Sequence, residues 1–208
     1  MKNLEIEFKW DGNSAAALQK GRRAFETLAQ VNHVQEVNIC DTYLDHADER
    51  FSKQKIAFRL RRVNKKWEAT FKTRTQIKNG KATRQEATLS LPDVDNLTQA
   101  LSFLQRKKTW KKLDVQNLQP RFILKNKRRV LMLSYKACQA EAALDTFIIY
   151  VCGREVKMRE IELELKGGKQ KDFEELATLF TAKSDLPFSV NSKVKTAETL
   201  LALWRKND

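Results

Sequence analysis

The stretch LEIEFKW, residues 4–10, constrains the fold of this chain more than any other segment. Apolar and charged residues alternate strictly along it, which is the pattern of a β-strand with two different faces. Glu5, Glu7 and Lys9 share the charged face. Neighbouring like charges on a strand cost free energy unless a counter-charge lies between them. A divalent cation bridging the two glutamates, with Lys9 on an anion bound to that cation, would remove this cost. An edge strand protected by its own charges is the simpler alternative.

Composition narrows the class of protein. The 208 residues suffice for one well-packed domain or two small ones, and 41% hydrophobic with 32% charged residues is typical of a globular protein. Three cysteines without a C-x-x-C spacing favour a reducing compartment over a disulfide framework or a zinc site. The sequence has no signal-peptide pattern and no apolar run of membrane-spanning length. We therefore expect a cytoplasmic protein with no membrane partner.

The formal net charge of +14 indicates an anionic partner. Nucleic acid, phosphorylated small molecules and an anionic membrane surface all fit this charge. A lysine-rich solvated surface is an alternative that needs no partner. Charge alone does not choose among them.

Periodicity predicts a chain of strands with helices inserted between and after them. Strands are expected at 34–45, 55–63, 66–74, 83–91, 139–151 and 159–167, and two more within 121–135, with a turn near Asn126 and the second strand starting at about Arg128. A hairpin is expected at Asn79-Gly80, a polar turn at 46–50, and a basic turn with Trp110 inward. Helices are expected from Asn13 or Ser14 to about 30, and at about 94–106, 171–182 and 193–205.

In most of these strands the charged residues lie on one face and large apolar residues on the other. A sheet that curls around its charged face, with helices over the apolar face, forms a barrel with a polar lumen. Buried like charges are prohibitive unless neutralised, so the lumen must hold a polyanion and a hard cation. Carboxylate clusters without His or Cys suit Mg²⁺ or Mn²⁺ better than zinc. We therefore expect one α+β domain over residues 1–208, an eight-stranded antiparallel closed β-barrel with a charged lumen and flanking helices.

Several short motifs occur in the order found in a known superfamily, from residue 4 to about residue 200. Through them the chain resembles the CYTH superfamily, the triphosphate tunnel metalloenzymes, which includes inorganic triphosphatases, thiamine triphosphatases and class IV adenylyl cyclases. The matching segments are ExExK at Glu5, Glu7 and Lys9, Tyr43-Leu44-Asp45, FRLRR with Arg59 and Arg61, ATFKT with Lys72, R-x-E at Arg84 and Glu86, Arg128, Ala143-Leu144-Asp145, E-x-E-x-E at Glu160, Glu162 and Glu164, and Ser192-Lys193.

Within the superfamily the chain is most similar to bacterial inorganic triphosphatases, on the segments WEATFKTR, LQPRF and REIELELKGG. This resemblance implies a metal-dependent hydrolase that cleaves inorganic triphosphate to pyrophosphate and phosphate. Many such proteins carry a second, histidine-rich CHAD domain, which we do not expect in 208 residues with two histidines. Thr88 stands where a second acid often follows R-x-E, which removes a partner for a metal or a lysine. Phe147 stands where glycine often follows the ALD segment, and we expect it to narrow one end of the tunnel.

The resemblance also assigns roles to individual residues. Lys9 and Tyr43 would orient the nucleophile, and one or two Mg²⁺ ions, or Mn²⁺, would serve as cofactor. The residues expected to bind phosphoryl oxygens are Lys9, Arg59, Arg61, Lys72, Arg84, Arg128 and Lys193, and those expected to bind metal are Glu5, Glu7, Asp145, Glu162 and Glu164. Glu86, Glu141 and Glu160 are interpreted as partners that hold the basic residues in place.

Three functions remain open. Hydrolysis of inorganic triphosphate leads. A thiamine or nucleoside triphosphatase or an adenylyl cyclase would need the same cradle, and a non-enzymatic binder of polyphosphate or nucleic acid would also fit the charge. Binders of single-stranded nucleic acid present aromatic platforms on their basic face, whereas Phe8, Phe58, Trp67 and Phe71 lie opposite the charges. Nucleic acid is therefore an unlikely partner, and we expect a monomer or homodimer that binds a small triphosphate.

Overall fold

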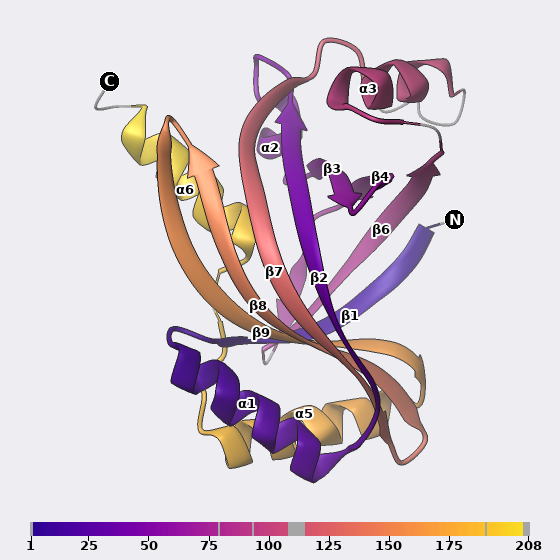
Figure 1. Ribbon diagram of the computed structural model, residues 1–208, viewed down its shortest axis with the longest axis vertical. Coiled ribbons are helices and arrows are strands. Elements are labelled where there is room, and N and C mark those ends of the chain that lie inside the picture. The colour runs from indigo at the N-terminus through magenta and orange to yellow at the C-terminus, as the bar shows by residue number, and fades with distance from the viewer. Residues whose placement is uncertain (1, 79, 93, 108–114, 190, 206–208) are drawn as a thin grey trace.

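The computed structural model describes residues 2–78, 80–92, 94–107, 115–189 and 191–205, which form a barrel of antiparallel strands with helices around it (Figure 1). The strands are β1 (Lys2–Asp11), β2 (Gln30–Asp45), β3 (Ala57–Val63), β4 (Lys66–Lys72), β5 (Gln76–Lys78), β6 (Lys81–Leu91), β7 (Gln119–Tyr135), β8 (Cys138–Val151) and β9 (Arg154–Gly168). The helices are α1 (Ala15–Leu28), α2 (Arg50–Lys53), α3 (Leu97–Arg106), α5 (Gln170–Ser184) and α6 (Lys193–Trp204).

Hydrogen bonds join the strands in the order β1-β9-β8-β7-β2-β3-β4-β6, and β1 pairs again with β6 to close the ring. The expected eight-stranded antiparallel barrel is therefore confirmed. The short β5 pairs only with β6 and extends the hairpin expected at Asn79-Gly80. Gly80 adopts a positive φ of 75°, as such a turn requires. Asn79 and Trp110 lie outside the described residues.

One expectation about local structure was wrong. No turn occurs near Asn126, because β7 runs unbroken for 17 residues and pairs with β2 on one edge and β8 on the other. The polar residues that suggested the turn are exposed lysines on the outer face, while Asn126 itself is buried on the inner face. The polar turn expected at 46–50 is confirmed, with turn residues at 47–48 that lead directly into α2. Asp45 organises this segment, since its carboxylate accepts hydrogen bonds from the backbone N–H groups of His46, Phe51 and Ser52.

The outer face of the barrel is apolar where helices cover it. Helices α1 and α5 lie side by side against β1, β8 and β9 (Figure 1). Trp10 is fully buried there and packs on Phe180, with ring centroids 4.5 Å apart. Helix α3 covers β3, β4 and β6 in a second cluster that contains Phe58 and Trp67. The alternation seen in the sequence therefore sends the aromatic side chains outward, under the helices, and the charges inward.

A third cluster places α6 at one end of the barrel interior. The inward-facing positions of β8 carry charge at Glu141 and Asp145, but are apolar from Phe147 to Val151. Ala197 and Leu201 of α6 pack against this apolar part of the inner face. Phe147 belongs to this contact and is 2% exposed. Because the inner face changes from charged to apolar at this point, a helix can close one end of the charged tunnel without burying unpaired charge.

Candidate active site

The inward faces of the strands surround a cavity of about 1010 Å³. Helix α6 and the segment after α2 contribute Lys193, Lys195 and Lys55 to its wall. Among the residues expected to bind phosphate or metal or to orient the nucleophile, those that line the cavity are Glu5, Glu7, Lys9, Tyr43, Arg59, Arg61, Lys72, Arg84, Arg128, Glu162, Glu164 and Lys193. Asp145 does not line it but lies fully buried behind the wall, in contact with Arg128 and Lys193. The barrel thus brings together groups that are up to 188 positions apart in the chain (Glu5 to Lys193).

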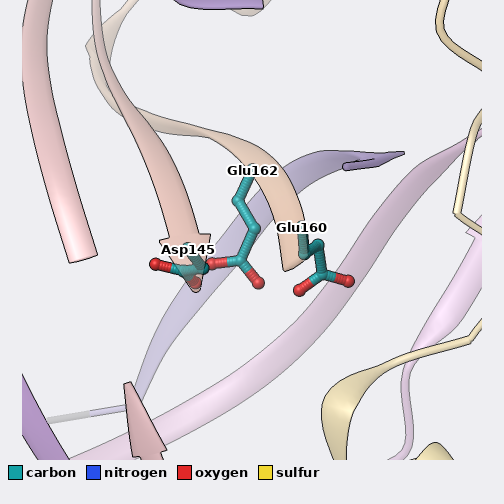
Figure 2. Close-up of side chains that lie close together, drawn as sticks. All are labelled: Asp145, Glu160 and Glu162. Carbon is teal, nitrogen blue, oxygen red and sulfur yellow. The ribbon is translucent and has the colours of Figure 1, made fainter. Parts of the chain in front are cut away.

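Three carboxylates of one wall form a tight group, Asp145 on β8 with Glu160 and Glu162 on β9 (Figure 2). One oxygen of each lies within 4.8 Å of the others. Lys193 Nζ lies 3.0 Å from Asp145 Oδ2 and 2.8 Å from Glu162 Oε1, and it also contacts Glu160. This lysine therefore donates hydrogen bonds to Glu160 and Glu162 and forms an ion pair with Asp145.

Two further cations hold Glu162. Lys9 Nζ lies 2.6 Å from Glu162 Oε1, and Arg128 Nη2 lies 2.5 Å from Oε2. Burial raises the pKa of Glu162, but the charges of Lys193, Lys9 and Arg128 outweigh burial and hold the pKa well below its ordinary value. Glu160 shares fewer cations, and burial raises its pKa to about 7. The group is therefore a compact network of paired charges around an ionised Glu162.

The remaining acids of the expected metal set, Glu5, Glu7 and Glu164, lie on another part of the wall. Glu5 is paired with Arg84 and with Lys72, 3.2 Å away. Glu7 faces Glu164 directly across the β1–β9 pairing. Burial raises the pKa of Glu164, whose one close cation is Lys166 at 2.8 Å.

The carboxylates of these three acids are donors of the type that a hard cation prefers, although among the described residues only the trio Asp145, Glu160 and Glu162 brings its oxygens within 4.8 Å of one another. Glu7 Oε1 is buried and has no hydrogen-bond partner among the described residues, although Arg84 Nη2 lies 3.2 Å away. Two facing carboxylates in a partly buried position repel each other, and an unsatisfied carboxylate oxygen between them is an available ligand. Oxygen-only donors of this kind suit Mg²⁺ or Mn²⁺. The expected five metal ligands are thus divided. Asp145 and Glu162 share Arg128 and Lys193, whereas Glu7 lies 3.3 Å from Lys9 Nζ and 3.2 Å from Arg84 Nη2 but keeps one oxygen without a hydrogen bond among the described residues.

The basic residues come from β1, β3, β4, β6, β7 and α6 and converge on the cavity. Burial opposes the charge of Lys9, but Glu162 and Glu7 outweigh it and raise the pKa of Lys9. Burial, together with the charges of Arg59 and Arg84, lowers the pKa of Lys72 to about 8. Arg59 Nε is buried and lacks a hydrogen-bond partner in the described part of the chain. A buried donor without a partner is unfavourable, so an anion that accepts this hydrogen bond would bind favourably.

Tyr43 lies opposite Arg59 in the β2–β3 pairing and stacks on Phe122, with ring centroids 4.7 Å apart. It lines the cavity but is 7% exposed. Lys9 reaches the cavity from β1, which is separated from β2 by three other strands in the sheet. The two residues expected to orient the nucleophile therefore act from opposite walls.

The sequence reasoning missed two buried polar residues that line the cavity, Asp41 and Asn126. Asp41 is buried beside Arg59 and Arg61 and lines the cavity. Its signal was present, because Asp41 and Tyr43 fall on the same face of a strand next to the strand with the two arginines. Asn126 was hidden by the turn wrongly expected there. Its Oδ1 is buried without a hydrogen-bond partner among described residues.

Comparisons with known proteins agree with this geometry. A model of the CYTH domain matches residues 3–197. An inorganic triphosphatase of Haemophilus influenzae is 28% identical over 200 residues, which cover 94% of this chain and 55% of the relative. The chain thus spans about half the length of the curated relative that it matches.

Solved structures show the same fold. A Hippeastrum protein described by its dominant triphosphatase activity superposes with a TM-score of 0.67 at 18% identity, covering 94% of this chain and 95% of that one. A Bacillus halodurans protein named as a candidate adenylate cyclase has a TM-score of 0.64 at 19% identity, covering 94% and 97%. At these identities the likeness concerns the fold.

Proposed function

The chain belongs to the CYTH domain family, and we propose that it is an Mg²⁺-dependent hydrolase that cleaves inorganic triphosphate to pyrophosphate and phosphate inside its tunnel. The observation that carries this proposal is the convergence of basic side chains from six elements on one cavity that also holds a separate set of carboxylates. A polyanion and a hard cation together would satisfy both sets. The Haemophilus influenzae relative is named for this activity.

The substrate is held by cations of the wall. Arg59 offers an unpartnered Nε, and arginine forks contact phosphoryl oxygens in pairs, whereas lysines act as point charges. Catalysis of phosphoryl transfer rests on positioning and on stabilising the charge of the transferred group. The residues that we assign to phosphate binding are Lys9, Arg59, Arg61, Lys72, Arg84, Arg128 and Lys193.

Lys193 and Lys9 already form ion pairs with carboxylates, so they can bind phosphate only if some of these ion pairs break. We assign Glu7 and Glu164, with Glu5, to the metal, because Glu7 pairs with Glu164 across β1 and β9 and its Oε1 makes no hydrogen bond among the described residues. Glu162 and Asp145 would join them only by giving up contacts with Lys9 and Lys193. A bound Mg²⁺ supplies charge neutralisation and helps to position the triphosphate and water for in-line attack.

The nucleophile is water, and we assign its orientation to Lys9 and Tyr43. The raised pKa of Lys9 makes it a cation at neutral pH, so it acts as a hydrogen-bond donor and electrostatic group. Tyr43 is held by its stack on Phe122, which fixes its ring against the wall.

A second candidate is a related reaction on a triphosphate that carries an organic group, by a thiamine or nucleoside triphosphatase or an adenylyl cyclase. The cavity volume of about 1010 Å³ favours it, because that is the size of a site for a much larger ligand than inorganic triphosphate. Passive binding of polyphosphate is a third possibility and requires no metal.

We further propose that residues 1–208 form one tunnel domain that works in a reducing, cytoplasmic compartment. One closed barrel includes every described strand except β5, and Cys40, Cys138 and Cys152 are all free. No helix in the described part of the chain is both long and apolar enough to cross a membrane.

The test is a panel of inorganic triphosphate, thiamine triphosphate and ATP, each with Mg²⁺, with phosphate, pyrophosphate and cyclic AMP scored as products. We expect inorganic triphosphate to be cleaved fastest, and activity to disappear with a chelator and return with added Mg²⁺. Faster turnover of ATP, or formation of cyclic AMP, would favour the second candidate. Binding without turnover of any triphosphate would favour the third possibility, passive binding of polyphosphate.

A further inference from the structure

Asp41 is a buried carboxylate in the wall that is expected to bind the anion. It is 2% exposed and lies directly opposite Arg61 in the β2–β3 pairing. Burial raises the pKa of Asp41, but the charges of Arg59 and Arg61 outweigh burial and hold it below its ordinary value. Asp41 is therefore ionised at neutral pH, next to two groups assigned to phosphate.

The two arginines contact Asp41 differently. Arg61 Nε lies 2.7 Å from Oδ1 and Arg61 Nη2 lies 2.8 Å from Oδ2, which is a two-point pair along one edge of the guanidinium. Arg59 Nη1 reaches Oδ2 only at 3.5 Å, and Arg59 Nε has no partner among the described residues. The Asp41 carboxylate thus fixes the Arg61 guanidinium through two short hydrogen bonds, but it does not use the Nε donor of Arg59.

A carboxylate in a phosphate site weakens anion binding by its charge, so its presence needs another benefit. A free arginine side chain has several rotatable bonds, and holding it in one pose on binding costs conformational entropy. A two-point bond to a buried carboxylate fixes that pose before the anion arrives. The donors of Arg61 that Asp41 does not use then remain for the ligand.

We propose that Asp41 is a positioning residue that preorganises Arg61, and more weakly Arg59, for phosphoryl oxygens. This inference rests on the proposed function, because it assumes that the tunnel binds a triphosphate. Asp41 itself contacts no substrate. Its effect on binding passes through Arg61, and removing the carboxylate weakens binding even though it removes a negative charge from the site.

The experiment measures binding of inorganic triphosphate by calorimetry in the presence of a chelator, so that no hydrolysis occurs. The proteins are wild type, Asp41→Asn, Arg61→Gln and the double variant. Glu68→Gln is the matched control, because Glu68 Oε1 lies 3.9 Å from Arg61 Nε, too far for a hydrogen bond. We expect Asp41→Asn to weaken binding by about tenfold or more, and Glu68→Gln by less than about twofold.

The double-mutant cycle separates positioning from a general structural role. We expect Asp41→Asn to change affinity by less than about threefold in the Arg61→Gln background, because the group through which it acts is gone. If Asp41→Asn alone does not fold, the comparison of Arg61→Gln with the double variant, in which both charges are removed, still decides the question. Kinetics with Mg²⁺ should show the loss mainly in KM.

Equal affinity of Asp41→Asn and wild type, or tighter binding by the variant, would overturn this inference alone. A large loss from Asp41→Asn in the Arg61→Gln background would also overturn it, since Asp41 would then act by another route. Wild type that neither binds inorganic triphosphate with the chelator nor cleaves it with Mg²⁺ would overturn the proposed function and the inference with it.

Discussion

Glu162 and Glu164 lie two residues apart on β9 and face the same cavity, yet their surroundings are opposite. Glu162 is held by Lys9, Arg128 and Lys193, and its pKa is lowered. Glu164 faces Glu7 and its pKa is raised, chiefly by burial. An ionised acid whose pKa is lower in the fold than in the unfolded chain stabilises the folded state. An ionised acid whose pKa is higher in the fold destabilises it.

The matched pair Glu162→Gln and Glu164→Gln tests this difference. We expect Glu162→Gln to lower the free energy of unfolding by roughly 3–5 kcal/mol at pH 7, because it leaves buried cations without their counter-charge. Glu164→Gln should leave it within about 0.5 kcal/mol of wild type or raise it. Urea denaturation measures both values. Equal losses in the two variants would show that the acids of β9 are equivalent, contrary to this account.

At the residue scale the sequence predicted most of the charged residues that line the cavity, but not which acid pairs with which base. Strand alternation was enough to place Lys9, Arg59 and Glu162 inside a barrel, because it fixes the face on which a side chain lies. It could not show that Lys193 forms ion pairs with three carboxylates, since these contacts join a helix to β8 and β9. Asp41 was overlooked because one acid on a strand carries no signal until its partner strand is known.

The element that most affects the shape of the tunnel is α6. Leu201 and Ala197 anchor it on the apolar inner part of β8, and its first residue, Lys193, then reaches the carboxylates of β8 and β9. Ser192 caps the helix by accepting a hydrogen bond from the Lys195 N–H. Helix packing and the position of Lys193 are therefore coupled.

Two leucines of α6 provide a matched test of that coupling. Leu201 is 4% exposed and Leu203 is 54% exposed. We expect Leu201→Ala to lower the free energy of unfolding by roughly 2–5 kcal/mol and to raise KM for triphosphate, because the cavity it leaves loosens the helix that carries Lys193. Leu203→Ala should change stability by less than about 0.5 kcal/mol. A destabilised Leu201→Ala with an unchanged KM would show that α6 is not coupled to the site.

At the element scale the sequence predicted α1, α3, α5 and α6 to within a few residues, from capping residues and helical spacing. It failed at β7, where charged residues around Asn126 resembled a turn. Lysine and arginine are common on the solvent-exposed face of a long strand. A few consecutive polar residues therefore do not distinguish a turn from a strand whose outer face is not covered by a helix. Only the pairing of β7 with β2 and β8 decides between them.

For the whole molecule, the formal net charge is +14. Among the described residues, eleven basic and nine acidic ones line the cavity, so the charges of its wall nearly balance without a ligand. The balance depends on pH, because these acids have shifted pKa values in both directions. Asp145 and Glu162 have lowered pKa values and stabilise the fold above the pKa of the unfolded chain, near 4.

The ionisation of Glu160 makes stability depend on pH in the opposite direction. Its pKa is about 7 in the fold against 4.5 as a model value, so its ionisation costs stability progressively as pH rises from 4.5 to 7. We expect the melting temperature of Glu160→Gln to rise relative to wild type over this interval, and the two to run parallel below it. Both proteins should lose stability as pH falls below about 4, because the unfolded chain then binds protons at Asp145 and Glu162 while the folded state, with its lowered pKa values, does not. Scanning calorimetry from pH 3 to about pH 8 makes the comparison. A constant difference across the interval would contradict the raised pKa of Glu160.

The most direct test of the tunnel as a site of triphosphate hydrolysis follows one reaction by phosphorus NMR. Wild-type protein, Mg²⁺ and inorganic triphosphate are combined, and Arg59→Ala is run beside it. We expect the triphosphate signals to be replaced by pyrophosphate and phosphate in equal amounts, with a rate lower by at least about tenfold for Arg59→Ala. Triphosphate signals that persist with the folded wild-type protein, or equal rates for the two proteins, would contradict the account.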